Sequence, residues 1–279
     1  LARTHGQSAT PTTMGKELLV FVERLSYQKT DFSNFVWRTK FGGATGNLNS
    51  HYFAYPDKDW LSFASQFINK LGLERNQYTT QIDHYDQHAQ LFQIIVRINN
   101  ILIDMAQDIW LYISMRYLMA KKKPEEVGSS TMPHKTNPID FENGEGNLLY
   151  ANSMLDFMTS KITKSRLQRD LTDSTVLRNV GVAFGHTLVG WKSLIKGLNK
   201  IEINPVKLNS DLENNWEVIG EGVQTLLKAV GVPDPYQKVK ELSQIYPKLT
   251  SEIWNNWYQQ LDISNDIKTK LMSLTPHNY

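Results

Sequence analysis

The chain has 279 residues, and its 30 basic and 28 acidic side chains give a formal net charge of +2. This even balance provides no broad field to attract nucleic acid or an anionic membrane, so any anion site has to be local. There is no cysteine, which excludes disulfides, thiol nucleophiles and cysteine-based metal sites. No apolar run approaches the roughly 20 residues of a membrane span, and no signal peptide is recognisable. We therefore expect a soluble cytoplasmic protein.

Long helical patterns dominate residues 1–200. The first extends over residues 14–39. Residues 85–120 contain no proline or glycine, and their apolar residues recur with helical periodicity over a wide stripe, which indicates burial among several neighbours. Similar patterns cover residues 143–161 and 174–200, whereas strand signals are scarce. The sequence therefore predicts an all-α fold with a long central helical bundle.

Shorter helices follow Lys200. Asn204 is a predicted N-cap with Pro205 at the first helical position, and Gly231 is predicted to end a helix that begins near Glu217. Further on, Thr250 and Ser264 are predicted N-caps, and a local core is expected from Trp254, Trp257 and Tyr258. We predict two domains, a central helical bundle at 1–200 and a smaller C-terminal helical domain at 201–279.

Four segments concentrate polar side chains outside the apolar stripes, at residues 3–7, 78–81, 128–138 and 166–179. In a bundle of long helices, loops from different helix ends meet at one end or midway along it. Because the segments are far apart in the sequence, they can converge either within one chain or across subunits.

The segment 128–138, Gly-Ser-Ser-Thr-Met-Pro-His-Lys-Thr-Asn-Pro, is named here the signature loop. Gly128 gives the backbone freedom to turn, the pair Ser129 and Ser130 leaves amide N–H groups free to face an anion, and two prolines stiffen the second half of the loop. Such a loop suits negatively charged ligands.

The fourth segment has the composition of a phosphate site. Asp173 is predicted to cap a helix that begins near Ser174, with Arg178 on the same helix face and Arg169 reaching in from the preceding loop. The alternative is a solvated helix end on which the two arginines pair with Asp170 and Asp173.

The signature loop resembles that of the fumarase/aspartase superfamily of lyases. Its continuation through residues 139–147, the Thr-His-Gly-Gln run at 4–7 and the Arg-Asp-Leu-Thr run at 169–172 resemble the adenylosuccinate lyases in particular. The resemblance extends over nearly the whole chain. The chain starts without methionine inside a motif, so we expect it to lack the N-terminal domain that brings a second catalytic histidine in the family, and to stop short of the family's usual final helix.

The resemblance implies a homotetramer whose active sites borrow loops from three subunits, and a β-elimination that releases fumarate from a succinylated purine nucleotide without metal or organic cofactor. It also implies roles within the signature loop. Ser129 is placed as the general base, and Lys135 and Asn137 stabilise the aci-carboxylate that forms; Ser130 contacts substrate. Serine is a weak base unless its alkoxide is stabilised, and Lys135 with the loop amides can do this.

Roles outside the loop are implied in the same way. His5 is placed as the general acid, or as its relay, with Glu142 near it, and Gln81 as a contact of the succinyl group. The remaining substrate contacts that the resemblance implies are Arg3, Thr4, Arg169, Ser174 and Arg178.

The residues also have simpler interpretations. Ser129 is equally typical of a flexible loop, Lys135 of a solvated charge, and Glu142 of an acid that complements a helix dipole. Three other functions stay open: another lyase of the superfamily acting on argininosuccinate, malate or aspartate; an inactive helical scaffold; and a nucleic-acid module, suggested only by Lys161, Lys164, Arg166 and Arg169.

Overall fold

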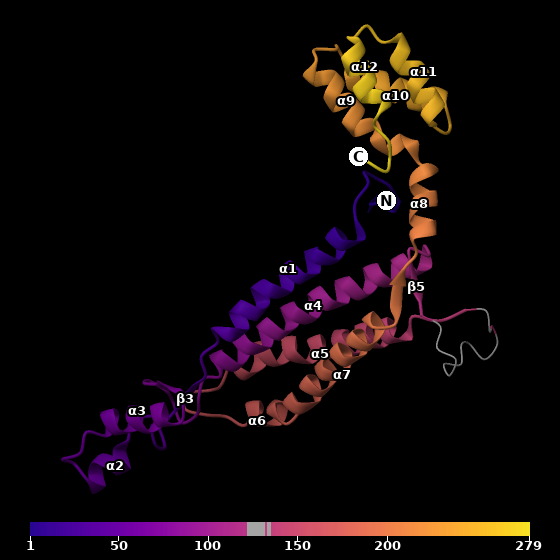
Figure 1. Cartoon of the computed structure of the whole chain (residues 1–279). Helices are drawn as coiled ribbons and strands as arrows, with labels where there is room; N and C mark the ends of the chain where they lie inside the picture. Colours follow the sequence, from indigo (N-terminus) through magenta and orange to yellow (C-terminus); the bar gives the residue numbers. More distant parts are fainter. Residues whose placement is uncertain (122–131, 133–134) are drawn as a thin grey trace. The chain divides into compact units, whose positions relative to one another are not determined.

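The computed structural model describes residues 1–121, 132 and 135–279 (Figure 1). Helices make up most of the described chain, which confirms the predicted all-α class. The strands are very short and form pairs: β1 (Arg3–Thr4) with β2 (Gln7–Ser8), β3 (Arg38–Lys40) with β4 (Glu74–Asn76), and β5 (Leu118–Ala120) with β6 (Ile201–Ile203). None of the described helices is both long and apolar enough to cross a membrane.

By its internal contacts the chain divides into two compact units. Unit 1 comprises residues 1–19, 112–119 and 202–279, and unit 2 comprises residues 20–111 and 120–201. The predicted division between residues 200 and 201 stays a prediction. Two helices cross between the units, α1 (Met14–Ser33) and α4 (Asp86–Ser114); unit 2 also holds α2 (Asn49–Ala54), α3 (Trp60–Lys70), α5 (Ile139–Ile162), α6 (Thr172–Leu177) and α7 (Val180–Leu198).

The long helices match the periodic segments, but their ends differ from the predictions. The helix predicted over residues 14–39 ends at Ser33, because residues 38–40 pair with β4 as a parallel strand. The helix predicted over 85–120 ends at Ser114, and Arg116 then adopts a φ of 63°. The predicted helix 174–200 is two helices, since the chain turns at Arg178 and Asn179 between α6 and α7.

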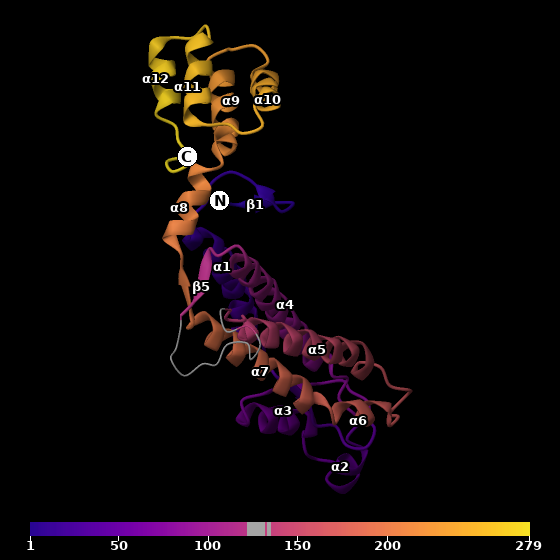
Figure 2. The ribbon, with the colours of Figure 1, turned by 90° about the vertical axis from the view of Figure 1, so that its right-hand side faces the viewer.

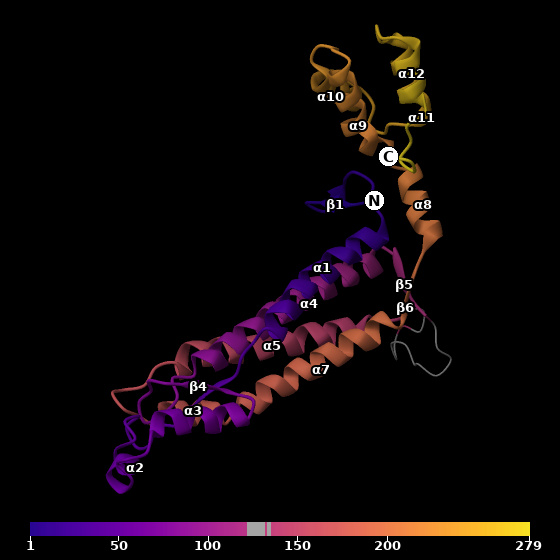
Figure 3. The ribbon, with the colours of Figure 1, turned by 60° about the vertical axis from the view of Figure 1, so that its left-hand side comes forward.

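Close packing of α5 against α7 forms the centre of unit 2 (Figure 3). Glycines at the crossing make this approach possible. A Cβ added to Gly144 would lie 2.5 Å from Leu194 Cδ2, and one added to Gly190 would lie 2.6 Å from Leu148 Cδ2. Both distances are far below van der Waals contact, so the two helices can approach this closely only if these positions carry no side chain.

A polar network joins α4, α5 and α7 in the interior of unit 2. Asn99 is fully buried; its amide donates to Asn152 Oδ1 (2.9 Å), and its carbonyl accepts from Trp191 Nε1 (2.8 Å). Asn152 in turn donates to Asn100 Oδ1 (2.8 Å). Because buried polar groups are costly unless they are paired, this network favours one register of the three helices over others.

Unit 1 contains the shorter helices predicted after Lys200. Trp254 and Tyr258 are each 1% exposed and stack at 5.6 Å, Trp257 packs beside them, and Trp254 Nε1 donates to the Trp216 carbonyl (3.1 Å). The predicted local core is thus confirmed. The helices of unit 1 after Lys200 are α8 (Pro205–Glu213), the 3-10 helix η1 (Trp216–Ile219), α9 (Gly220–Ala229), α10 (Pro235–Ile245), α11 (Ser251–Gln260) and α12 (Asn265–Met272).

The predicted caps of these helices are largely confirmed. Asn204 accepts from the Lys207 amide and Thr250 from the Ile253 amide, at 3.2 and 3.3 Å. Gly231 follows α9 with a φ of 80°, as expected of a helix-terminating glycine. Ser264 occupies the N-cap position of α12 without a side-chain cap hydrogen bond.

The glycine crossing leads to a stability test with an internal control. In α7, Gly190→Ala forces a methyl group against Leu148, whereas Gly185→Ala places one where nothing lies within 4 Å. Overpacking typically costs about 1–3 kcal/mol, and alanine gains about 1 kcal/mol over glycine in a helix. We expect Gly190→Ala to lower the urea midpoint relative to Gly185→Ala; equal midpoints would contradict the close packing.

Candidate functional site

The predicted site residues fall into three separate places in the described chain. His5, Arg3 and Thr4 belong to unit 1, whereas the other described candidates belong to unit 2. Ser129 and Ser130 lie outside the described residues. The structure therefore bears on the surroundings of the signature loop and on its partners, but not on the two serines.

His5 lies at the tip of a two-residue hairpin turn. Arg3 pairs with Ser8 and Thr4 with Gln7, so His5 and Gly6 alone connect the strands. Both have positive φ, 53° and 75°, as a tight turn that follows the strand twist requires. Positive φ is uncommon outside glycine, and such strain concentrates at functional sites. The hairpin presents an exposed imidazole on a short connection.

Arg3 has a charged neighbourhood that the sequence did not indicate. Burial raises the pKa of Asp211, but the hydrogen bond from Lys207 outweighs burial, and the nearby Tyr117 and the charge of Arg3 add to its effect, so the pKa is lowered. Lys207 Nζ lies 2.6 Å from Asp211 Oδ1. Arg3 thus has a carboxylate in its electrostatic neighbourhood, while its own guanidinium donates to the Gly6 carbonyl (3.2 Å).

Lys135 and Asn137 are exposed just before α5, and Glu142 lies exposed in its first turn. Glu142 Oε1 accepts a hydrogen bond from Trp110 Nε1 at 3.0 Å. Sequence reasoning missed this partner, since Trp110 has the pattern of one more apolar residue in a helical stripe. The contact fixes the Glu142 carboxylate against the C-terminal part of α4.

Gln81 is half-buried in the segment between β4 and α4. Two contacts restrict the conformation of that segment. A Cβ on Gly46 would lie only 2.0 Å from the Thr79 carbonyl oxygen, and the buried Asn76 amide donates to Asp83 Oδ1 (3.1 Å). Gln81 is therefore carried by a loop that has little space in which to move.

The phosphate-type segment is built differently from the prediction. Helix α6 begins at Thr172, so Asp173 is inside it and only 2% exposed; the prediction that Asp173 is the N-cap is wrong. The N-cap position is occupied by Leu171, which has no side-chain cap, and Asp170 just before it accepts from the Thr172 amide (3.0 Å) and hydroxyl (2.6 Å). It also pairs with Arg166 (3.1 Å).

This arrangement leaves two cations available at the end of unit 2. Arg169 and Arg178 are exposed, and in the part of the chain that the structure describes neither forms an ion pair. The alternative in which both arginines pair with Asp170 and Asp173 is therefore not what the structure contains. Ser174, four residues before Arg178, donates its hydroxyl to the Leu171 carbonyl (3.0 Å).

The segment containing Gln81 and the segment containing Arg169 meet at this end. Tyr85 lies near the buried Asp173; burial first, and then the charge of Asp173, raise the pKa of Tyr85. The ring of Tyr85 lies 5.2 Å from that of His88, and Trp37 approaches His88 from another side at 5.3 Å. Tyr85, His88 and Asp173 are thus contacts behind the site that sequence reasoning missed.

Helix α5 separates the two places in unit 2 (Figures 1 and 2). Glu142 lies in its first turn, and Arg169 follows its last residue, Ile162. A helix of 24 residues spans roughly 36 Å. The residues around the start of α5 and those of the phosphate-type segment are therefore at opposite ends of one unit, farther apart than the length of a mononucleotide.

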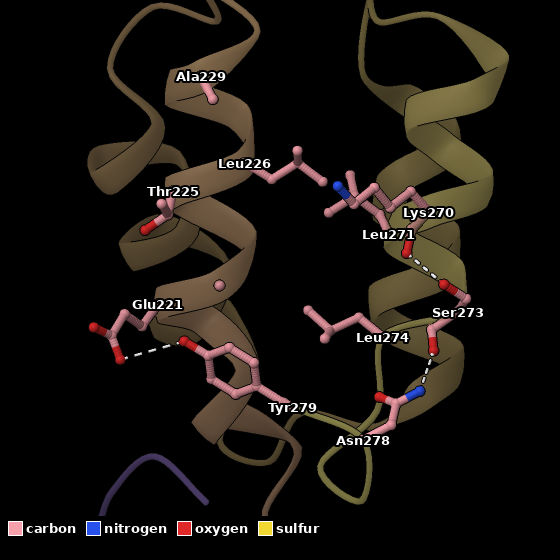
Figure 4. Close-up of a pocket in the computed structure, with 11 residues that line it drawn as sticks. Glu221, Thr225, Leu226, Ala229, Lys270, Leu271, Ser273, Leu274, Asn278 and Tyr279 are labelled. Carbon is pink, nitrogen blue, oxygen red and sulfur yellow. Dashed lines mark hydrogen bonds between the residues drawn. The ribbon is translucent and has the colours of Figure 1, made fainter.

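A cavity of about 630 Å³ lies in unit 1, between α9 and the end of the chain (Figure 4). There Tyr279 donates its hydroxyl to Glu221 (3.3 Å) beside Leu226 and Leu274. None of the predicted site residues lines it. Among the described residues, no three His, Asp or Glu side chains come together in a way that could hold a metal ion.

Comparisons with known proteins address the family directly. Residues 1–151 match the family model described as Lyase, and residues 165–279 match the model described as Adenylosuccinate lyase C-terminal. The chain belongs to the Lyase family. The adenylosuccinate lyase of Dictyostelium discoideum is 51% identical, that of Legionella pneumophila 50% and that of Escherichia coli 44%, each over 100% of this chain.

The match covers only part of those relatives, because the chain spans 61% of their length. Among solved structures, the 3-carboxy-cis,cis-muconate lactonizing enzyme from Pseudomonas putida matches 100% of this chain and 63% of its own, with a TM-score of 0.77 and 18% identity. At that identity the likeness concerns the fold alone. It agrees with the helical architecture described above.

The half-buried His88 behind the site gives a pH test. Burial lowers the pKa of His88 from its ordinary 6.5, and Asp83 only partly offsets this, so folding favours the neutral ring. The stability that the neutral His88 ring contributes is fully present above the pKa of His88 in the unfolded chain. It is lost as the pH falls through the lower pKa of His88 in the folded protein. We expect His88→Gln to lose less stability than wild type between pH 7 and pH 5, measured by urea midpoints.

The exposed His84, which lies 3.0 Å from Asp86, is the matched control. His84→Gln should still show the loss of stability that the His88 ring causes. Identical pH dependence in wild type and His88→Gln would show that the His88 ring is not the titrating group.

Proposed function

We propose that the complete protein catalyses β-elimination of fumarate from adenylosuccinate, giving AMP, and the same cleavage of the succinylated aminoimidazole carboxamide ribotide of purine synthesis. The observation that carries the proposal is the 44–51% identity to adenylosuccinate lyases over the whole of this chain. Because the chain spans 61% of those relatives, the activity is proposed for the complete protein. We also propose that the protein is cytoplasmic.

In the proposed mechanism, Ser129 takes the proton from the succinyl carbon beside a carboxylate. The electron pair of that C–H bond moves into the carboxylate, which becomes an aci-carboxylate stabilised by Lys135 and Asn137. The pair then returns to form the carbon–carbon double bond as the C–N bond breaks. His5, as acid or relay, delivers a proton to the leaving nitrogen, and fumarate and the nucleotide are released.

The remaining candidates bind and orient substrate in this proposal. Arg169, Ser174 and Arg178 hold the phosphate. The two exposed guanidinium groups, which form no ion pair with any residue that the structure describes, support this role because guanidinium forks match phosphate oxygens. Gln81 and Ser130 contact the succinyl end. On the hairpin, Arg3 and Thr4 hold substrate beside His5, and Glu142 supports the histidine.

Assembly into a homotetramer with shared sites is part of the proposal. The roughly 36 Å length of α5 supports it, because one substrate cannot touch both ends of one unit. Residues of the signature loop and of the phosphate-type segment must then come from different chains. Apolar side chains left exposed on the bundle helices are consistent with such contacts, among them Tyr27 (63%), Phe157 (56%) and Ile195 (60%).

The test of this function is fumarate release by the complete protein, followed by ultraviolet absorbance. Adenylosuccinate should be cleaved, AMP should inhibit, and argininosuccinate, malate and aspartate should be left intact. The last three carry no phosphate, so their cleavage would support another lyase of the superfamily. A well-folded protein that cleaves none of these substrates would support the scaffold alternative.

Replacing the proposed base has a defined expected effect. Ser129→Ala should lower kcat by a factor of about 10² to 10⁴, the usual contribution of a positioned base. Binding of AMP, measured by calorimetry, and the oligomeric state should be unchanged, which separates lost chemistry from lost structure. Wild-type turnover by this variant would remove Ser129 from the mechanism.

The phosphate role is tested by a pair of arginine variants. Arg178→Ala should weaken AMP binding by about 1.5–3 kcal/mol, because a charged hydrogen bond is lost. Arg166→Ala is the control, since Arg166 is equally cationic but is 81% exposed and pairs with Asp170. Calorimetry that gives the same affinity for both variants would refute the role of Arg178.

A further inference from the structure

Both ends of the segment that carries the signature loop are attached to one residue, Lys200. The backbone N–H of Lys121 donates to the Lys200 carbonyl oxygen at 2.7 Å. At the other end, the Lys200 ammonium lies 2.9 Å from Asp140 Oδ2. Lys121 is the last described residue before the loop, and Asp140 follows its final proline by two positions. Lys121 and Asp140, which flank the loop in the described chain, are therefore both in contact with Lys200.

The attachment at Asp140 is more than a surface ion pair. The Lys200 side chain is 17% exposed and that of Asp140 11%, whereas Lys196, which also contacts Asp140 (3.1 Å), is 61% exposed. Exposed pairs contribute little, because solvent screens them and two side chains must be ordered. Burial raises the pKa of Asp140, but hydrogen bonds from Lys200 and Lys196 outweigh it, and the pKa is lowered, so the carboxylate stays charged.

Further contacts pack the start of α5 against the last turns of α7. Ser193 Oγ donates to the Asp140 carbonyl (2.8 Å), and Asn143 donates to Ser193 Oγ (3.0 Å). A Cβ on Gly197 would lie 2.9 Å from Phe141 Cζ, so the helices touch here without intervening space. Lys200 follows directly on this junction and links it to the other end of the loop.

We infer that Lys200 is a positioning residue of the active site, which attaches Lys121 and Asp140, on either side of the signature loop, to the junction of α5 and α7. The inference rests on the proposed function, since it gives a role to the residues that the loop carries. Lys200 itself touches no reacting atom. Its effect is on placement, because a shift of about 1 Å in a catalytic group can cost about 10²-fold in rate.

The experiment uses the complete protein and compares Lys200→Met with Lys196→Met. Both variants remove one ammonium from Asp140, but only the first removes the buried one. Lys200→Met should lower kcat by about 10- to 100-fold, with the affinity for AMP unchanged, since the phosphate-type segment is at the far end of α5. Lys196→Met should turn over like wild type, and Lys200→Arg should recover most of the loss.

Hydrogen exchange supplies a readout that does not depend on activity. In Lys200→Met, the amides of the first turn of α5 should exchange faster. The Lys121 amide, which donates to the Lys200 backbone carbonyl, and the amides around the buried Asn99 should keep their protection. If Lys200→Met does not fold, Asp140→Asn neutralises the same pair at constant size and should give the same pattern.

Each remaining outcome counts against the inference. Wild-type kcat in Lys200→Met, equal losses in the two methionine variants, unchanged exchange in the first turn of α5, or a parallel loss of AMP affinity would each overturn it. A wild-type protein that releases no fumarate would instead contradict the proposed function. In that case the exchange comparison would still decide whether the Lys200 side chain holds the start of α5.

Discussion

The close approach of α5 and α7 is the constraint on which the rest of unit 2 depends. Two helices can pack this closely only because Gly144 and Gly190 face the opposing leucines. The pairing fixes the start of α5 against the end of α7, and the polar network of Asn99 fixes the same helices against α4. Because the packed helices are rigid, the positions of their ends are fixed, and the loops start from those ends.

Much of the helical architecture could be predicted, because a helix with a buried face has apolar residues at regular helical spacing, and this spacing is visible in the sequence. The stripe over residues 85–120 and the caps at Asn204 and Thr250 are local signals, and the structure contains the corresponding elements. The helix ends were less predictable. β3 pairs with β4 across a separation of more than thirty residues, and no local pattern contains that pairing.

The candidate site was predictable only in part, and for a similar reason. Residue types and motifs marked Gln81, Arg169 and Arg178, but the contacts behind them come from tertiary structure. Asp173 looked like a cap because it precedes a periodic segment, yet the helix starts earlier and turns its carboxylate inward beside Tyr85. The sequence analysis singled out Glu142 but not Trp110, whose indole N–H donates to it from α4. Ser129 and Ser130 remain sequence-based assignments.

The hairpin at His5 has a consequence for how that histidine can be studied. Its backbone sits in the left-handed region, where side chains branched at Cβ are strongly disfavoured and asparagine is well tolerated. An exchange for valine or threonine would therefore deform the turn as well as delete the imidazole, and any lost activity would have two inseparable origins. Asparagine keeps a polar side chain and accepts the same backbone geometry, which makes it the substitute that isolates the contribution of the ring.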